Sequence, residues 1–347
     1  MNPLISIQIL RAVAAWLVVF SHFMQIFPTS PLINNGWENY GWFGDFGVSI
    51  FFVTSGFIMF YSLSIRMYSA KEFFARRILR IVPAYWFFTG LMALLSLQYA
   101  QEFSYTGWNW HTLVSSLFFT LSKNPSGIGY FPLLTVGWTL SYEMFFYALL
   151  GLCILTFSKF PFWACIFTLI ALPLSGNHWI LGILIAPKWL YVFAYGIVLG
   201  YAYTRMQNIK PHLLYALGIF MLVLAVTLSI NIHLFLNPIQ VRENVMGPLF
   251  AFLLIGSPLC FEPTLRNVNF KAFRFLRYLG DISYSTYLLH TLVIGVFLHY
   301  IGKLDSSLGE FSLLLIASLT IFALSHLSFQ YIEIGPLQKM LKRKLIN

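Results

Sequence analysis

The first apolar stretch of the chain, Ile7 to Phe27, contains two ionisable side chains, Arg11 and His22. It is long enough to cross a bilayer as a helix. At about 100° per residue the two side chains lie on nearly the same helix face, about 16 Å apart along the axis. An arginine within a membrane span is costly unless it faces a protein interior or a wet cavity. The pair therefore predicts a functional site inside the protein.

A cluster of three arginines, Arg76, Arg77 and Arg80, stands at the start of the third apolar stretch. Residues three or four positions apart share a helix face, so Arg76 and Arg77 can each lie beside Arg80. Guanidinium groups that repel one another in this way suit a phosphate-bearing ligand. Such clusters are also typical of an anchor on anionic lipid, which is the commoner explanation for the cluster by itself. Pro83 predicts a bend in the same helix.

Glu143 is one of few carboxylates placed deep in an apolar stretch. Its depth from the outer membrane edge is similar to that expected for His22. An imidazole and a carboxylate that meet in a low-dielectric cavity can act as a general base and its orienting partner. A structural ion pair between two helices, with Arg11 as a further member, is an equal alternative.

The composition determines the class of protein. Hydrophobic residues make up 59% of the 347 positions and charged residues only 9%, which excludes a water-soluble globular protein. We expect an all-α polytopic membrane helix bundle with about ten transmembrane helices, forming a single domain over residues 1–347. The expected spans lie near residues 7–27, 42–63, 78–98, 134–156, 161–177, 188–204, 212–232, 244–261, 278–301 and 311–331.

Most of the 21 lysines and arginines fall in alternate loops between these spans. With the N-terminus in the cytoplasm, those loops all face the cytoplasm, as the positive-inside rule requires. We therefore expect both the N-terminus and the C-terminus to be cytoplasmic. The basic residues are spread over several loops and the C-terminal tail, so the net charge of +10 predicts topology and no nucleic-acid partner.

The three cysteines, Cys153, Cys165 and Cys260, lie in or at the ends of apolar stretches. Their spacing matches neither a metal site nor a disulfide framework. We expect them to be small core residues, and no metal site is predicted.

Six segments together resemble the acyltransferase-3 family of bacterial membrane O-acyltransferases, over nearly the whole chain. Any one of them is a weak signal, but all six occur in the family's order and on the expected sides of the membrane. The short chain is similar, within the family, to exopolysaccharide acetyltransferases. The segments are LRAVAAWLVVFSH, FGVSIFFVTSGFIMF, RRILRIVPAYW, WTLSYEMFFY, LGDISYSTYLLH and YIEIGP.

The resemblance implies transfer of an acyl group, usually acetyl, from cytoplasmic acyl-coenzyme A to a carbohydrate hydroxyl. Arg76, Arg77 and Arg80 would hold the phosphates of the donor, and Arg11 would contact a phosphate or the pantetheine path. His22 would be the general base, and Glu143 would hold its tautomer and stabilise the imidazolium. A covalent acyl-histidine relay is a less favoured variant.

The resemblance also implies an acceptor pocket, in which we place Trp138, Tyr142, Tyr284 and His290. For His290, a hydrogen bond to a neighbouring helix is an equal alternative. The acceptor would be a glycan or a lipid-linked sugar, reached from a bacterial cytoplasmic (inner) membrane in contact with its lipids.

Two further positions complete the comparison with the family. Glu333 is expected to fix the end of the last span near the arginines rather than to react. Many relatives carry an aspartate where this chain has Ser49, although Asp45 is nearby.

The rival from another class is a transporter or flippase for a glycan or a lipid-linked intermediate. Intramembrane arginine, histidine and glutamate also serve proton coupling and substrate pathways. Paired broken helices in internal repeats would favour that class, and the sequence shows none.

Overall fold

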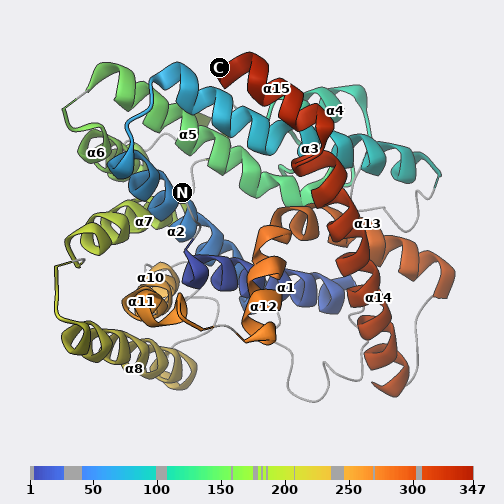
Figure 1. Cartoon of the computed structure of the whole chain (residues 1–347). Coiled ribbons are helices and arrows are strands. Elements are labelled where there is room, and N and C mark those ends of the chain that lie inside the picture. The colour runs from blue at the N-terminus through green and yellow to red at the C-terminus, as the bar shows by residue number, and fades with distance from the viewer. Residues whose placement is uncertain are drawn as a thin grey trace.

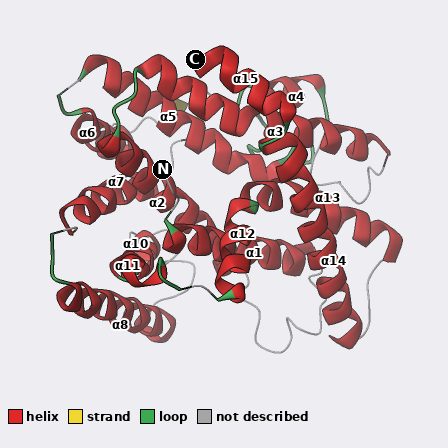
Figure 2. Ribbon diagram, viewed as in Figure 1, coloured by secondary structure: helices red, strands yellow, loops and turns green. Residues whose placement is uncertain are grey.

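Nearly all of the described chain is helical, as expected for an all-α membrane bundle (Figures 1 and 2). Two short antiparallel strands, β1 (Trp179–Ile180) and β2 (Ile183–Leu184), pair with each other. The computed structural model describes residues 4–26, 41–98, 108–157, 159–174, 179–180, 183–184, 187–206, 208–235, 246–268, 270–301 and 307–346.

A helix lies at each of the ten expected spans. Within the described residues, seven helical segments are long and apolar enough to cross a membrane. Residues 27, 175–177 and 244–245 of the expected spans lie outside the described residues. The ten helices are α1 (Ile5–Ile26), α2 (Gly41–Ile65), α3 (Ala70–Gln98), α5 (Trp138–Thr156), α6 (Pro161–Leu174), α7 (Pro187–Met206), α8 (Pro211–Phe235), α10 (Met246–Cys260), α13 (Ser283–Ile301) and α14 (Ser307–Ser328).

Shorter elements connect these helices. The 3₁₀ turn η3 directly precedes α5, and the π-helical turn η4 directly follows α14 and leads into the C-terminal helix. The cysteines are buried and free, as expected of core residues. The short elements are α4 (Trp110–Leu117), η3 (Thr135–Gly137), α11 (Glu262–Leu265), α12 (Lys271–Asp281), η4 (Phe329–Glu333) and α15 (Pro336–Ile346).

The structure differs from the expectation at the ninth span. The first residues of that span belong to α12, which ends at Asp281, and α13 begins separately at Ser283. The break follows Gly280, where the α12 backbone lies directly against that of α1, so that a Cβ atom would overlap the Gln8 carbonyl. The Ser283 hydroxyl donates a hydrogen bond of 2.7 Å to the Gly280 carbonyl.

Helix α1 lies at the centre of the bundle, in contact with α2, α10, α12 and α13, whereas α8 packs on α10 at the edge (Figure 1). The first backbone N–H groups of α1 have no partner within that helix. The buried carboxylate of Glu262 accepts hydrogen bonds from the Ile5 and Ser6 N–H groups, both at 2.9 Å, and from the Ser6 hydroxyl at 2.6 Å. This cap from α11 fixes the helix that carries Arg11 and His22.

Helices α2 and α7 approach each other through two glycines. A Cβ atom at Gly56 would overlap the Phe193 carbonyl, and one at Gly196 would overlap the Val53 carbonyl. Small residues are what allow two membrane helices to pack backbone against backbone.

Replacement of either glycine is expected to push α2 and α7 apart. We expect Gly56→Val or Gly196→Val to destabilise the protein by about 3 kcal/mol, as overpacking does. Thermal unfolding in detergent measures the effect. The matched control is Gly90→Ala, because Gly90 lies in α3 with no atom within 4 Å of an added Cβ. That change should stabilise the helix by about 0.5–1 kcal/mol, and equal effects at all three positions would contradict the packing argument.

Candidate active site

The described residues enclose a cavity of about 380 Å³ between α1, α2, α3, α5, α13, η4 and α15. A volume of this order is typical of ligand pockets, which span about 300–1,000 Å³. All four arginines predicted from the sequence line it, although they come from two separate helices. Its ionisable lining consists of five basic side chains and two carboxylates beside four tyrosines; the charged residues are Arg11, Arg76, Arg77, Arg80, Lys342, Glu143 and Glu333.

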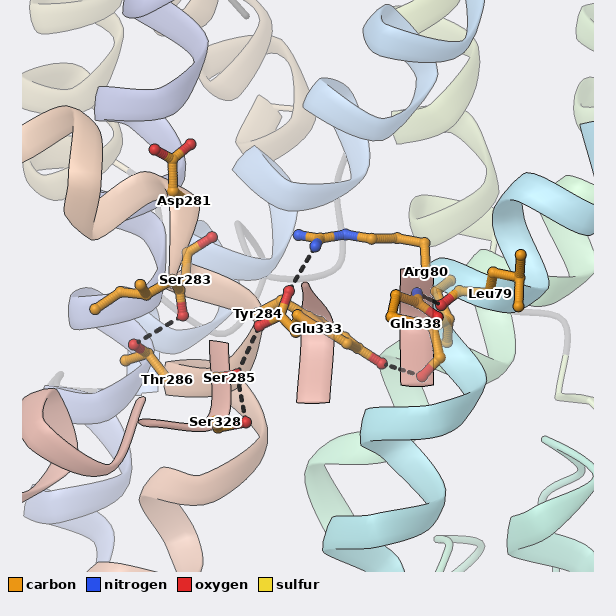
Figure 3. A network of polar contacts seen from close by, with 12 residues as sticks. Leu79, Arg80, Asp281, Ser283, Tyr284, Ser285, Thr286, Ser328, Glu333 and Gln338 are labelled. Atoms are coloured by element: carbon orange, nitrogen blue, oxygen red, sulfur yellow. Dashed lines mark hydrogen bonds and ion pairs between the residues drawn. The ribbon is translucent and has the colours of Figure 1, made fainter. Parts of the chain in front are cut away.

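Arg80 is held by a buried carboxylate from the other end of the sequence. Its Nη1 atom lies 2.5 Å from Oε2 of Glu333, and its guanidinium lies over the ring of Tyr284 (Figure 3). The Ser285 hydroxyl donates to the other Glu333 oxygen at 2.6 Å and lies 2.8 Å from the Ser328 hydroxyl. The expectation that Glu333 fixes the end of the last span near the arginines is thus confirmed.

The remaining arginines differ in how their charge is balanced. Arg76 forms a 2.7 Å ion pair with Glu72, one turn earlier on α3. Arg77 lies over the ring of Tyr147, at 5.7 Å from its centroid, and Arg11 donates to the Gln8 amide oxygen at 3.1 Å. Within the described part of the chain, neither Arg11 nor Arg77 contacts a carboxylate. These two guanidinium groups are therefore free to neutralise an anionic ligand.

Glu143 lies in this cavity with the arginines, and its contacts differ from the expectation. Its Oε1 atom accepts a 2.9 Å hydrogen bond from the Ser55 hydroxyl and another from the Tyr147 hydroxyl. The expected hydrogen bond to His22 is not formed between these described residues. Glu143 lines the cavity, whereas His22 is not part of its lining.

His22 instead contacts His290 of α13. His290 Nε2 lies 3.2 Å from His22 Nδ1, and the ring centroids are 5.0 Å apart. His290 is fully buried, whereas His22 is only partly buried. The two histidines therefore form a pair in which His22 is the accessible member.

Backbone carbonyls indicate where the protons of this pair lie. His22 Nδ1 is 3.0 Å from the Val18 carbonyl and His290 Nδ1 is 3.3 Å from the Thr286 carbonyl. A carbonyl oxygen only accepts, so each Nδ1 carries the proton in the neutral pair. His290 Nε2 is then an acceptor for His22 Nδ1–H, and His22 Nε2 keeps a free lone pair, as a general base requires.

Tyr287 links the cavity to the histidine pair. It lines the cavity, and its ring centroid is 5.9 Å from that of His290. Its hydroxyl lies 2.8 Å from the Thr139 hydroxyl and donates to the Val136 carbonyl at 2.9 Å, which fixes the ring. The pair thus lies directly behind one wall of the cavity.

Trp138, Tyr142 and Ser49 also lie outside the cavity lining. Trp138 and Tyr142 pack in an aromatic cluster around Phe52, with ring centroids 6.5 and 6.2 Å from its own. Their contact with an acceptor stays a prediction. Ser49 is buried, and its hydroxyl donates to the Asp45 carbonyl at 2.9 Å.

Several cavity residues were not singled out from the sequence: Ser55, Tyr147, Gln338 and Lys342. Helical spacing would have pointed to Tyr147, which lies one turn after Glu143. The other three are ordinary polar residues of a helix, and only their packing identifies them.

The chain matches one known protein family over most of its length. Residues 4–327 match the family described as an acyltransferase domain. The chain belongs to the acyltransferase-3 family. The cavity and the histidine pair both lie on segments that the match covers, except for the part of the lining that η4 and α15 contribute.

Two curated relatives of this acyltransferase cover most of its length. The exopolysaccharide production protein ExoZ of Rhizobium meliloti (strain 1021) is 31% identical over 273 residues, which are 73% of this chain and 77% of the relative. ORF330 of Acidianus two-tailed virus, named provisionally as an acetyltransferase, is 25% identical over 302 residues, 82% of this chain and 81% of the relative. No solved structure is significantly similar to the chain.

Arg80 forms an ion pair with a carboxylate and Arg77 does not, so we expect their replacement to change the free energy of unfolding by different amounts. Arg80→Met would leave the buried Glu333 carboxylate without its cation, so we expect a loss of about 1–3 kcal/mol. Arg77→Met removes no ion pair and should change stability by less than about 0.5 kcal/mol. Thermal unfolding of the two acyltransferase variants in detergent compares them directly. Equal destabilisation would contradict the assignment of the pairs.

Proposed function

We propose that this acyltransferase transfers an acyl group, usually acetyl, from acyl-coenzyme A to a hydroxyl of a cell-surface or exported glycan. The observation that carries the proposal is a cavity with two arginines that have no carboxylate partner among the residues the structure describes. One of them lies on the helix that also carries His22. The name of the relative ExoZ, an exopolysaccharide production protein, supports a glycan acceptor. The protein would work as a multi-pass protein of the bacterial inner membrane.

The donor would bind with its phosphates among the arginines. Coenzyme A is a cytoplasmic polyanion, and the topology expected from the loop charges puts this end of the bundle on the cytoplasmic side. Arg11 and Arg77 would neutralise phosphates directly, while Arg76 and Arg80, already paired with Glu72 and Glu333, would add to the positive field.

Helix α1 would determine how far the donor must extend from its phosphates to the thioester. Arg11 and His22 lie eleven positions apart, which corresponds to about 16 Å along a helix axis. A donor held by its phosphates at Arg11 would extend its pantetheine arm past Tyr287 toward the histidine pair. The acceptor hydroxyl would approach the accessible side of His22.

At His22, the free Nε2 would take the proton of the acceptor hydroxyl while that oxygen attacks the thioester carbonyl carbon. A C–O ester bond forms and the C–S bond breaks, and the proton passes from the imidazolium to the leaving thiolate. The Val18 carbonyl and His290 Nε2 both accept from Nδ1–H, so they would stabilise the imidazolium in the role first expected of Glu143.

Glu143 keeps a place in the site with a changed role. Both hydrogen bonds that it receives from described residues go to Oε1, which leaves Oε2 without a donor. A pantetheine amide N–H in the cavity would supply one. Glu143 would then position the donor arm rather than orient His22.

Donor binding and chemistry should separate between two variants. We expect His22→Ala to lower acyl transfer by about 10²–10⁴-fold, the usual contribution of a general base, with coenzyme A binding unchanged. Arg77→Met should mainly raise the dissociation constant for coenzyme A. The measurements are transfer of labelled acetyl to a glycan acceptor and calorimetric binding of coenzyme A. Wild-type protein that binds no coenzyme A would contradict the enzyme proposal and leave the transporter alternative. Normal transfer by His22→Ala would contradict only the role of His22 as the general base.

His290 should act through His22. We expect His290→Leu to lower kcat by about tenfold or more with an unchanged KM for the donor, because Nδ1 of His22 loses an acceptor. His290→Gln can restore an acceptor oxygen and should recover part of the activity. If Leu and Gln variants behave alike, or if only KM changes, His290 does not support the base.

A further inference from the structure

The C-terminal helix α15 docks on α3 through a defect that Pro83 creates. Proline has no N–H, so the carbonyl four residues earlier, at Leu79, loses its helical hydrogen bond. The Gln338 side-chain amide of α15 donates its Nε2 hydrogen bond to this Leu79 carbonyl (Figure 3). The carbonyl that Pro83 leaves without a helical partner is therefore a docking point for α15, while the bend expected at Pro83 stays a prediction.

This contact also orients the rest of the Gln338 side chain. Because Nε2 must face a carbonyl, Oε1 faces the other way, and Gln338 lines the cavity. Gln338 is 4% exposed, and its Oε1 atom is buried without a hydrogen-bond partner. A buried acceptor left in this state destabilises the protein without ligand, and a ligand N–H would remove that cost.

Lys342 stands one turn after Gln338 on the same face of α15. It lines the same cavity as Arg76 and Arg80, and its side chain is exposed, so it lies where the cavity opens. Like charges gathered in this way repel one another unless an anion lies between them.

We infer that α15 completes the donor site: Lys342 contacts a phosphate of the acyl donor, and Gln338 Oε1 accepts a hydrogen bond from a donor N–H. The inference rests on the proposed function, since it adds two binding residues to that site. The N–H group belongs either to a pantetheine amide or to the adenine amine.

Calorimetric binding to the full-length protein in detergent tests this inference with three probes. Coenzyme A carries all the groups, adenosine 3′,5′-bisphosphate carries the phosphates and the amine, and pantetheine carries the amides. The variants are Lys342→Met and Gln338→Met. The control is Lys344→Met, an exposed lysine of α15 that does not line the cavity.

We expect Lys342→Met to weaken coenzyme A and the bisphosphate about fivefold and to leave pantetheine unchanged, with no effect of Lys344→Met. Gln338→Met should weaken whichever fragment holds the N–H group. If wild type binds no coenzyme A, the proposed function itself fails. If wild type binds but Lys342→Met binds equally well, or only loses affinity for anionic lipid vesicles, the role of α15 is overturned.

Because Gln338→Met also removes the contact with Leu79, its unfolding temperature is measured alongside binding. If Gln338→Met lowers the unfolding temperature, Lys342→Met decides whether α15 contributes to donor binding. The Lys342 side chain forms no hydrogen bond or ion pair with described residues, so its loss should leave the fold unchanged. A normal unfolding temperature with unchanged binding of both fragments would overturn the acceptor role of Gln338.

Discussion

An arginine inside a membrane bundle needs a partner for its charge. The properties of the cavity depend on which of its arginines form an ion pair within the protein. Arg80 pairs with Glu333, and this ion pair joins α3 to η4, the turn that follows α14. Arg76 finds Glu72 on its own helix. Arg11 and Arg77 have no carboxylate partner among the described residues. The paired arginines therefore stabilise the fold, and the charges of the other two are available to an anionic ligand. The free-energy cost of burying a charge thus explains both why the arginines are rare in the spans and why they differ in role.

Helix α1 connects the cavity to the histidine pair, because it contains both Arg11 and His22. The Glu262 carboxylate caps its N-terminus, and the close contact with Gly280 fixes its position against α12. A rigid helix then sets the distance between Arg11, in the cavity, and His22, beside His290. Hydrogen bonds within α1 and contacts with its nearest neighbours would thus hold the proposed donor site and the proposed base at a constant separation.

The sequence predicts the helices, and it predicts that the four arginines lie at one site and that Glu333 lies near them. A charge in an apolar stretch is visible locally and must face the interior, whereas the roles of these residues stay predictions. It does not predict the partner of Glu143, because depth in a span leaves rotation about the helix axis undetermined. For the same reason, the sequence left a pocket role for His290 and a hydrogen bond to a neighbouring helix equally open, and the structure shows the contact with His22 of α1. The contact between Gln338 and Leu79 was beyond prediction: Pro83 shows that a carbonyl is freed, but only tertiary packing shows which side chain answers it.

The central claim is that one cavity binds the donor phosphates and directs the thioester toward His22. Structure determination of the protein with coenzyme A tests it most directly. We expect phosphates in contact with Arg11 or Arg77 and a pantetheine arm that runs past Tyr287 toward the histidine pair. Coenzyme A bound on another surface, or an arm that leaves the cavity away from His22, would contradict it.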